Sequence, residues 1–149
     1  MEFKNASQKE CYEKISPWME ELFGVTIKVH PERPSYFLQV GSSYTVIQVL
    51  PWKEESSVIR AMCCVVTHPE VNAELMEFLL KTNNKLIFGG FLLDDDNDIW
   101  IQQTINGSTV DKEELKHCVL SIAITADKLD DEIIQKWGGE RGIDRKAKG

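Results

Sequence analysis

The chain has 149 residues, of which 42% are hydrophobic and 28% are charged, and its 24 acidic and 17 basic residues give a net charge of −7. This balance is typical of one globular domain with its own core, and the excess of acid argues against binding to nucleic acid or to an anionic membrane surface. The sequence has no apolar run of bilayer length and no apolar stretch typical of a signal peptide near its start, so we expect a cytoplasmic protein.

The first predicted element is a helix over residues 8–23, with Ser7 as its cap. Apolar side chains recur along one face of this segment at helical spacing. Pro17 lies inside it, and a proline removes a backbone donor and clashes with the preceding turn. We therefore expect a kink, or two short helices that meet near Ser16, with Gly24 as the end of the segment.

Four strands are predicted next, because apolar and polar residues alternate or because apolar residues run together; they cover residues 25–29, 36–40, 44–50 and 58–67. The fourth is apolar on both sides apart from Arg60, a pattern typical of a central strand with both faces covered. The connection over residues 51–56 reads as a charged loop that carries Trp52.

A second helix is expected to begin near Pro69, which suits a first helical turn, and to end at Asn83 and Asn84. A fifth strand is predicted over residues 85–93, followed by a polar turn over 94–98. From Ile99, the alternation of apolar and polar residues predicts a sixth strand.

A long helix is predicted from Asp111 to Gly139. Asp111 can cap its start, and Glu114 stands at the capping-box position three residues later. Gly138 and Gly139 end it, because glycine accepts the left-handed geometry of a C-cap. The apolar residues of this segment recur in steps of three and four and form one stripe, which contains Leu115, Cys118, Val119, Ile122, Ala123, Ala126, Leu129, Ile133 and Trp137.

These elements predict a single α+β domain over residues 1–139, followed by a polar, disordered tail over 140–149. The connections between strands are short, which favours antiparallel pairing. We expect an antiparallel sheet of five or six strands packed with three helices, in the order α-β-β-β-β-α-β-β-α.

The acidic turn was considered as a cation site, because Asp94, Asp96 and Asp98 have the spacing that opens a calcium loop. The sixth and twelfth positions of such a loop need glycine and glutamate, and here they hold Ile99 and Ile105. We predict a hairpin turn whose carboxylates face water, and the spacing leaves weak cation binding open.

No other pattern predicts chemistry. The three histidines and four cysteines lack metal-ligand spacing, and the chain has neither a nucleophile elbow nor a phosphate-binding glycine loop. We therefore predict no metal, no cofactor and no catalytic residue. The cysteines lie within apolar patterns and are predicted to be buried, reduced thiols; they are Cys11, Cys63, Cys64 and Cys118.

The aromatic and apolar residues suggest an interaction surface. Trp100 alternates with Ile101, and Met62 alternates with Ala61, so each points to the opposite side of its strand. If helices cover one side of the sheet, the other apolar side needs a remaining helix, a second subunit or a ligand. We select Trp52, Met62 and Trp100 as the residues that contact a partner.

Three segments carry a family resemblance: residues 79–84 at the end of the second helix, the hairpin over 91–101, and the long helix with its entry at 110–115 and its end at 133–139. Together with the strand block over 25–67, they resemble the YbjN-like proteins, which share the fold of bacterial type III secretion chaperones. The chain departs from the simplest form of this family in a fourth strand of the first block and in a basic tail.

The resemblance implies helices packed on an antiparallel sheet, homodimers, and binding of extended polypeptide segments without enzymatic activity. The leading hypothesis is a chaperone- or adaptor-like module that binds a protein or peptide partner through an exposed apolar surface of the sheet or helices, with backbone pairing at a strand edge and acidic rims that favour basic flanks. Two alternatives stay open at this point: a structural or regulatory homodimer with no client, and an enzyme with a dispersed site.

Overall fold

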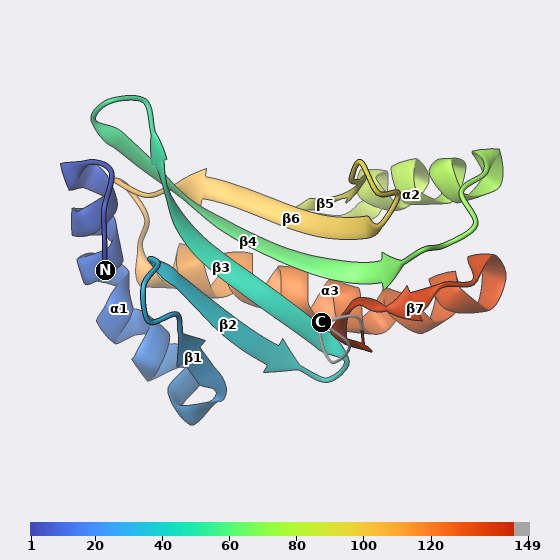
Figure 1. Cartoon of the computed structure of the whole chain (residues 1–149), viewed down its shortest axis with the longest axis horizontal. Coiled ribbons are helices and arrows are strands. Elements are labelled where there is room, and N and C mark those ends of the chain that lie inside the picture. Colours follow the sequence, from blue (N-terminus) through green and yellow to red (C-terminus); the bar gives the residue numbers. More distant parts are fainter. Residues whose placement is uncertain (145–149) are drawn as a thin grey trace.

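A computed structural model describes residues 1–144 (Figure 1). This part of the chain forms a seven-stranded antiparallel sheet and three α-helices, which confirms the predicted α+β class. The helices and the 3-10 turn are α1 (Ala6–Phe23), η1 (Gly24–Thr26), α2 (Ala73–Lys85) and α3 (Lys112–Trp137). The strands are β1 (Ile27–Val29), β2 (Ser35–Val40), β3 (Ser43–Trp52), β4 (Ser56–Thr67), β5 (Gly90–Leu93), β6 (Ile99–Asn106) and β7 (Glu140–Arg141).

The first helix begins earlier than predicted and is not divided. Its cap is Asn5, not Ser7, because the Asn5 side chain accepts a hydrogen bond from the Gln8 amide at 2.7 Å. Pro17 lies inside a single helix, so the prediction of two helices is wrong. Ile15 and Met19, on either side of the proline, are fully buried, and this packing holds the turn around Pro17 in place.

The hairpin of β3 and β4 is longer than the sequence predicts. Pro51 pairs with Ser57 and Trp52 pairs with Ser56, so the predicted loop over residues 51–56 shrinks to three residues, 53–55. Lys53 supports the tight turn with a positive φ of 55°.

The second helix and the fifth strand also differ from their predicted bounds. Asn72 caps α2 by accepting a hydrogen bond from the Leu75 amide at 2.9 Å, so Pro69 precedes the helix. Lys85 is still helical, and β5 begins only at Gly90. The apolar residues between them are not in a strand: Ile87 is 89% exposed.

The long helix confirms its prediction closely. Asp111 caps it by accepting a hydrogen bond from the Glu114 amide at 2.7 Å, and Gly138 ends it with a φ of 70°. The predicted stripe is buried except for Leu129, which is half-buried, and Asp130 is buried beside it.

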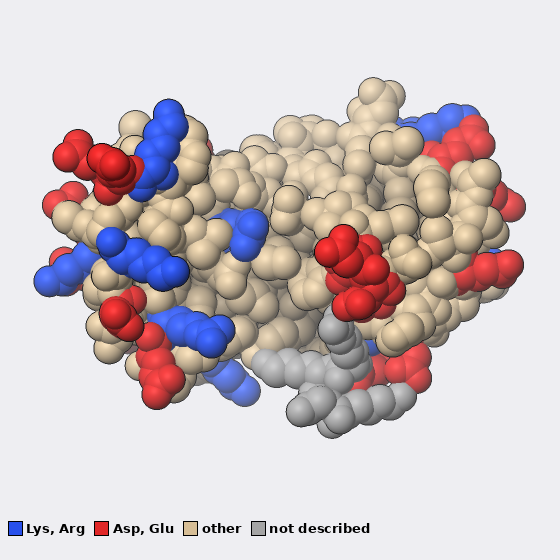
Figure 2. Space-filling view, turned by 45° about the horizontal axis from the view of Figure 1, so that its top comes forward, with Lys and Arg blue, Asp and Glu red and all other residues tan. Residues whose placement is uncertain are grey.

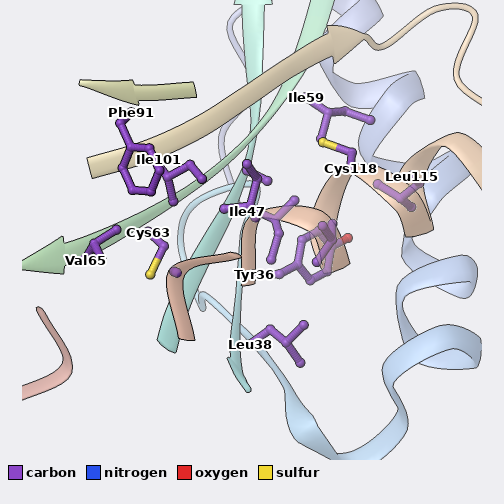
Figure 3. Packing of buried hydrophobic residues seen from close by; sticks show 14 of the residues in the cluster. Tyr36, Leu38, Ile47, Ile59, Cys63, Val65, Phe91, Ile101, Leu115 and Cys118 are labelled. Carbon is purple, nitrogen blue, oxygen red and sulfur yellow. The ribbon is translucent and has the colours of Figure 1, made fainter. Parts of the chain in front are cut away.

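The three helices all pack on one face of the sheet, where α3 contacts β3, β4 and β6, and α1 contacts β3 and β4 (Figure 1). Alternate strand residues point into this layer and form the core with α3 (Figure 3); they include Tyr36, Leu38, Ile47, Ile59, Cys63, Val65, Phe91 and Ile101. The second helix joins the same layer through Leu75 and Leu79, and the Phe78 ring lies 5.1 Å from the Trp137 ring.

The predicted disordered tail starts instead with a short strand. Glu140 pairs with Thr67 and Arg141 pairs with Val66, so β7 lengthens the pairing of β4 beyond the point where β3 begins. Gly139 makes this approach close, because its φ is 91° and a Cβ there would clash with the Thr67 carbonyl. Residues 142–144 continue in a helical turn, and residues 145–149 of the predicted tail lie outside the described residues. No helix within residues 1–144 is long and apolar enough to cross a bilayer.

Candidate functional site

None of α1, α2 and α3 covers the sheet face opposite to them; at one end of this face, the helical turn that begins at Gly142 lies against Cys64. Strand register places alternate residues of β2, β3, β4, β5 and β6 on this side, and they are half-exposed where their inward neighbours are buried. We call this surface the open face; its central apolar residues are Phe37, Tyr44, Val46, Leu50, Val58, Met62, Cys64, Leu92 and Trp100. Such a broad apolar surface is typical of a site that binds another molecule.

The open face carries little charge. The charged residues at outward positions of β1–β6 are Lys28 and Arg60, and none of these positions holds an acid. In Figure 2 this side of the molecule is largely tan; most charged groups lie toward its ends, while one acidic cluster stands right of the centre and one basic group left of it. The net charge of −7 therefore lies mainly outside this surface.

Arg60 lies in the middle of the open face, on β4 between Val58 and Met62. Gln48 and Thr104 stand beside it on the neighbouring strands, and the Arg60 Nη2 donates a hydrogen bond to Gln48 Oε1 at 3.1 Å. The Arg60 Nε atom is buried and has no hydrogen-bond partner within residues 1–144.

The structure brings two of the three predicted contact residues together. Met62 is opposite Gln102, and Trp100 is opposite Cys64, so Met62 and Trp100 are diagonal neighbours on adjacent strands. The indole Nε1 of Trp100 donates a hydrogen bond to Asp94 Oδ2 at 2.7 Å, which fixes the orientation of the ring.

Trp52 lies on the same side of the sheet but apart from the other two. It ends β3 at the tip of the hairpin rather than standing in a loop, and 47% of it is exposed. Lys53 Nζ lies 4.5 Å from the centroid of its ring. Trp52 lies six positions along β3 from Val46, which faces Met62, so Trp52 and Met62 are about 20 Å apart.

A hollow of about 350 Å³ lies at the β1 side of the open face. Phe37 and Tyr44, whose rings stack at 5.7 Å between centroids, line it together with Lys28 and Gln39. Its walls are mainly side chains of strands, so an apolar group of a bound molecule could enter it without displacing the core.

The outer edge of β5 is already occupied. The side-chain amide of Asn83 accepts a hydrogen bond from the Phe91 amide at 2.7 Å and donates one to the Phe91 carbonyl at 3.2 Å. It thus takes both backbone positions that an added strand would use at this residue. The other edge strand, β1, has only three residues. Backbone pairing of a partner's strand is therefore unfavourable at both edges of the sheet.

A partly buried polar cluster, which the sequence analysis did not identify, joins the β2–β3 turn to α3. Asp127 Oδ1 accepts hydrogen bonds from the Ser42 amide and the Ser42 hydroxyl, both at 2.7 Å, while Asp130 Oδ2 lies 2.5 Å from the same hydroxyl. The Ser42 hydroxyl has one proton, so it donates to one carboxylate at a time, and both contacts are hydrogen bonds only when Asp130 is protonated and donates to the Ser42 oxygen. Burial raises the pKa of Asp130, and the two bonds from Ser42 lower the pKa of Asp127.

The acidic turn is a hairpin between β5 and β6, as predicted, but the prediction that its carboxylates face water is wrong for Asp98, which is buried, and for Asp94, which is half-buried. Asp94 Oδ1 accepts hydrogen bonds from the amides of Asp96 and Asp98, both at 2.9 Å. Asp98 accepts another from the His68 amide at 2.9 Å. These carboxylates therefore hold the turn itself. Within residues 1–144, no group of three or more His, Cys, Asp or Glu side chains is placed to hold a metal ion.

The predicted buried thiols are found at three of the four cysteines. Cys11, Cys63 and Cys118 are buried, and burial raises the pKa of Cys63 to about 11 and that of Cys118 to about 12. Cys64 is half-exposed, because it points outward on the open face rather than into the core.

Comparisons with known proteins identify the family of this chain and solved structures with a similar fold. The model of a family described as "T3SS (YopN, CesT) and YbjN peptide-binding chaperone 1" matches residues 10–145. The fold is similar to that in the crystal structure of the ExsC–ExsE complex, with a TM-score of 0.60 and 11% identity, over 87% of this chain and 96% of that chain. It is also similar to YbjN from E. coli, with a TM-score of 0.58 and 16% identity, over 81% of this chain and 92% of that chain. No curated protein matches the sequence.

Proposed function

Since this chain belongs to the family of T3SS (YopN, CesT) and YbjN peptide-binding chaperones, we propose that it binds an extended segment of a partner polypeptide on the open face of its sheet. The observation that carries the proposal is the one-sided arrangement of the helices, which leaves an apolar, nearly uncharged surface exposed to water. A partner segment that covers this surface gains the free energy of apolar burial.

Side-chain contacts would supply most of the binding free energy. Met62 and Trp100 form the central apolar pair, and the hollow beside Phe37 offers a place for one apolar side chain of the partner. Complete burial of a large apolar side chain contributes about 1.5–3 kcal/mol, and the half-exposed residues of the open face would each contribute a part of this amount. Micromolar binding corresponds to a net free energy of about −8 kcal/mol, so it requires many such contacts, because they must also offset the cost of association.

The proposed role is protective and not enzymatic: the partner's apolar segment is kept from water and from aggregation while it is bound. The crystal structure of the ExsC–ExsE complex contains a protein with this fold together with another protein, which supports a polypeptide partner for this chain. We place this activity in the cytoplasm, as the sequence predicts.

A matched pair of methionine variants tests the site. We expect Met62→Gln to weaken the binding of peptides selected from a displayed library of random short peptides by about tenfold, because an apolar contact at the centre of the open face is lost. Met76, on α2, is 45% exposed on the helical side, so Met76→Gln should leave the affinity unchanged. Fluorescence anisotropy with labelled peptides measures both.

Two results would contradict the proposal. The library could yield no peptide that binds the wild-type protein, or the two methionine variants could weaken binding to the same extent, which would place the site away from the open face. Thermal unfolding of both variants serves as the control for folding.

A further inference from the structure

We infer that the segment bound on the open face carries one carboxylate side chain, Asp or Glu, between apolar residues, and that this carboxylate pairs with Arg60. The inference rests on the proposed function and specifies the chemistry of the partner. It starts from the position of Arg60, a cation in the middle of an otherwise apolar surface on the central strand β4.

The guanidinium of Arg60 has unused capacity for hydrogen bonds. It carries five N–H donors, and Gln48 is its hydrogen-bond acceptor within residues 1–144. The Nε atom is already out of contact with water and has no partner there. None of the ion pairs formed within residues 1–144 includes Arg60.

Covering the open face changes the environment of this charge. A wholly apolar segment would remove the guanidinium from water without replacing its hydration, which is strongly unfavourable for an unpaired charge. A carboxylate at the same place compensates the lost hydration, because its two oxygens can accept two hydrogen bonds from the planar guanidinium group. Arg60 therefore selects for an acidic residue at the centre of the bound segment.

A second copy of this chain fits the open face poorly. In a two-fold symmetric pair, each open face would cover the other, and its outward strand positions contain no acid to pair with Arg60. Asp94, at the border, already accepts hydrogen bonds from two backbone amides and from Trp100. Self-association by this face would bury two guanidinium groups without a counter-charge.

The overall charge limits how acidic the partner can be. The protein carries a net charge of −7, so a strongly acidic segment would be repelled before it reached the face. A segment with a single carboxylate in an apolar centre, and with neutral or basic flanks, satisfies both the local and the long-range electrostatics.

Selection from the displayed library of random short peptides tests this inference. On the wild-type protein we expect enrichment of peptides with an Asp or Glu between apolar residues. On Arg60→Gln we expect apolar peptides without the acid preference. For a peptide selected on the wild type, replacement of its acid by the corresponding amide should weaken binding at least about tenfold, and this difference should vanish on Arg60→Gln.

Two further variants distinguish the effect of the bidentate guanidinium geometry from the effect of the positive charge. Arg60→Lys keeps the charge but loses the bidentate geometry, so it should retain a reduced preference for acid. Lys128→Gln removes the same unit of charge from the exposed side of α3 and should leave the preference unchanged.

The outcomes distinguish the inference from the proposed function. If apolar peptides without an acid preference bind the wild type and depend on Met62, the inference about Arg60 is overturned and the proposed function stands. If no peptide binds the wild type, both fail. Enrichment of basic instead of acidic centres would also overturn the inference.

Discussion

Asp130 lies on the apolar, buried face of α3 between Ala126 and Ile133, and it is almost fully buried although it is an acid. Its carboxyl group and the carboxylate of Asp127 both lie within hydrogen-bond distance of the Ser42 hydroxyl, which has a single proton to donate. A protonated Asp130 that donates to Ser42, which then donates to Asp127, satisfies all three groups. This arrangement agrees with the raised pKa of Asp130 and the lowered pKa of Asp127.

The raised pKa predicts how Asp130→Asn changes stability with pH. In the wild type, the stabilisation from protonated Asp130 is complete below the ordinary pKa of an aspartate and is lost as the pH rises through the raised folded value. Asparagine does not ionise, so the variant should gain stability relative to the wild type from acid to neutral pH. The gain is roughly 1.4 kcal/mol for each unit by which folding raises the pKa. Urea unfolding over a pH series measures it.

The neighbouring aspartate gives the opposite slope and so serves as the control. Because hydrogen bonds from Ser42 lower the pKa of Asp127, its contribution is present above the ordinary pKa and is lost as the pH falls. Asp127→Asn should therefore lose stability relative to the wild type at neutral pH. Parallel slopes for the two variants would contradict the assigned proton positions.

At the scale of elements, the edge strand β5 depends on a side chain of α2. Asn83 satisfies the amide and carbonyl of Phe91, which would otherwise be an exposed edge. Native sheets use such devices to prevent pairing with other chains. The helix therefore contributes its apolar face to the core and an amide group to the sheet.

We expect Asn83→Ala to lower the free energy of unfolding by about 1–3 kcal/mol, because two backbone groups of Phe91 lose their partner. The freed edge should also make the variant more prone to aggregate. Asn84→Ala, at the exposed neighbouring position, should change stability by no more than about 0.5 kcal/mol. Chemical denaturation and light scattering test both effects; equal stability of the two variants would contradict this role of Asn83.

The same elements indicate what the sequence could predict. The cap and stripe of α3 were predictable because they follow from spacing along one helix. The strand predicted over residues 85–93 was wrong in its first half, because apolar residues such as Ile87 resemble a strand locally although they are exposed. The sequence did not predict that Asn83 binds the backbone of β5 or that Asp130 is a buried acid. Each of these side chains contacts a residue of another element, and spacing along the chain does not identify such contacts.

At the scale of the whole molecule, three helices on one face and none on the other define the candidate site. Alternation along β4 and β6 was enough to assign Met62 and Trp100 to the same side as each other, and the family match confirms the resemblance stated from the sequence. The position of Trp52 at a hairpin tip depended on the length of β3, which Pro51 obscured. The sequence shows Arg60 as the one charged residue in an apolar strand. That its Nε atom has no hydrogen-bond partner in the described part of the chain could be known only from the register of the sheet.

The charge at the centre of the open face should also keep the molecules apart. We expect Arg60→Leu to increase self-association, because it joins the apolar residues on either side into one uninterrupted surface. Arg60→Lys retains the charge and should sediment as the wild type does. Sedimentation velocity over a concentration series compares the three proteins. An unchanged oligomeric state in Arg60→Leu would contradict this role. The homodimer implied by the family resemblance stays a prediction.

The pairing of β7 with β4 has a consequence for synthesis of the protein. The central strand gains β3 early, gains β6 after α2 has been made, and gains β7 only after all other elements in residues 1–144 are complete. Until β7 has been synthesised, the backbone groups of Val66 and Thr67 that pair with β7 have no hydrogen-bond partner there. A product of premature termination at Gly138 would retain all three helices and yet present a bare backbone at the middle of its sheet, which suits it to recognition by the quality-control proteins that bind exposed strands.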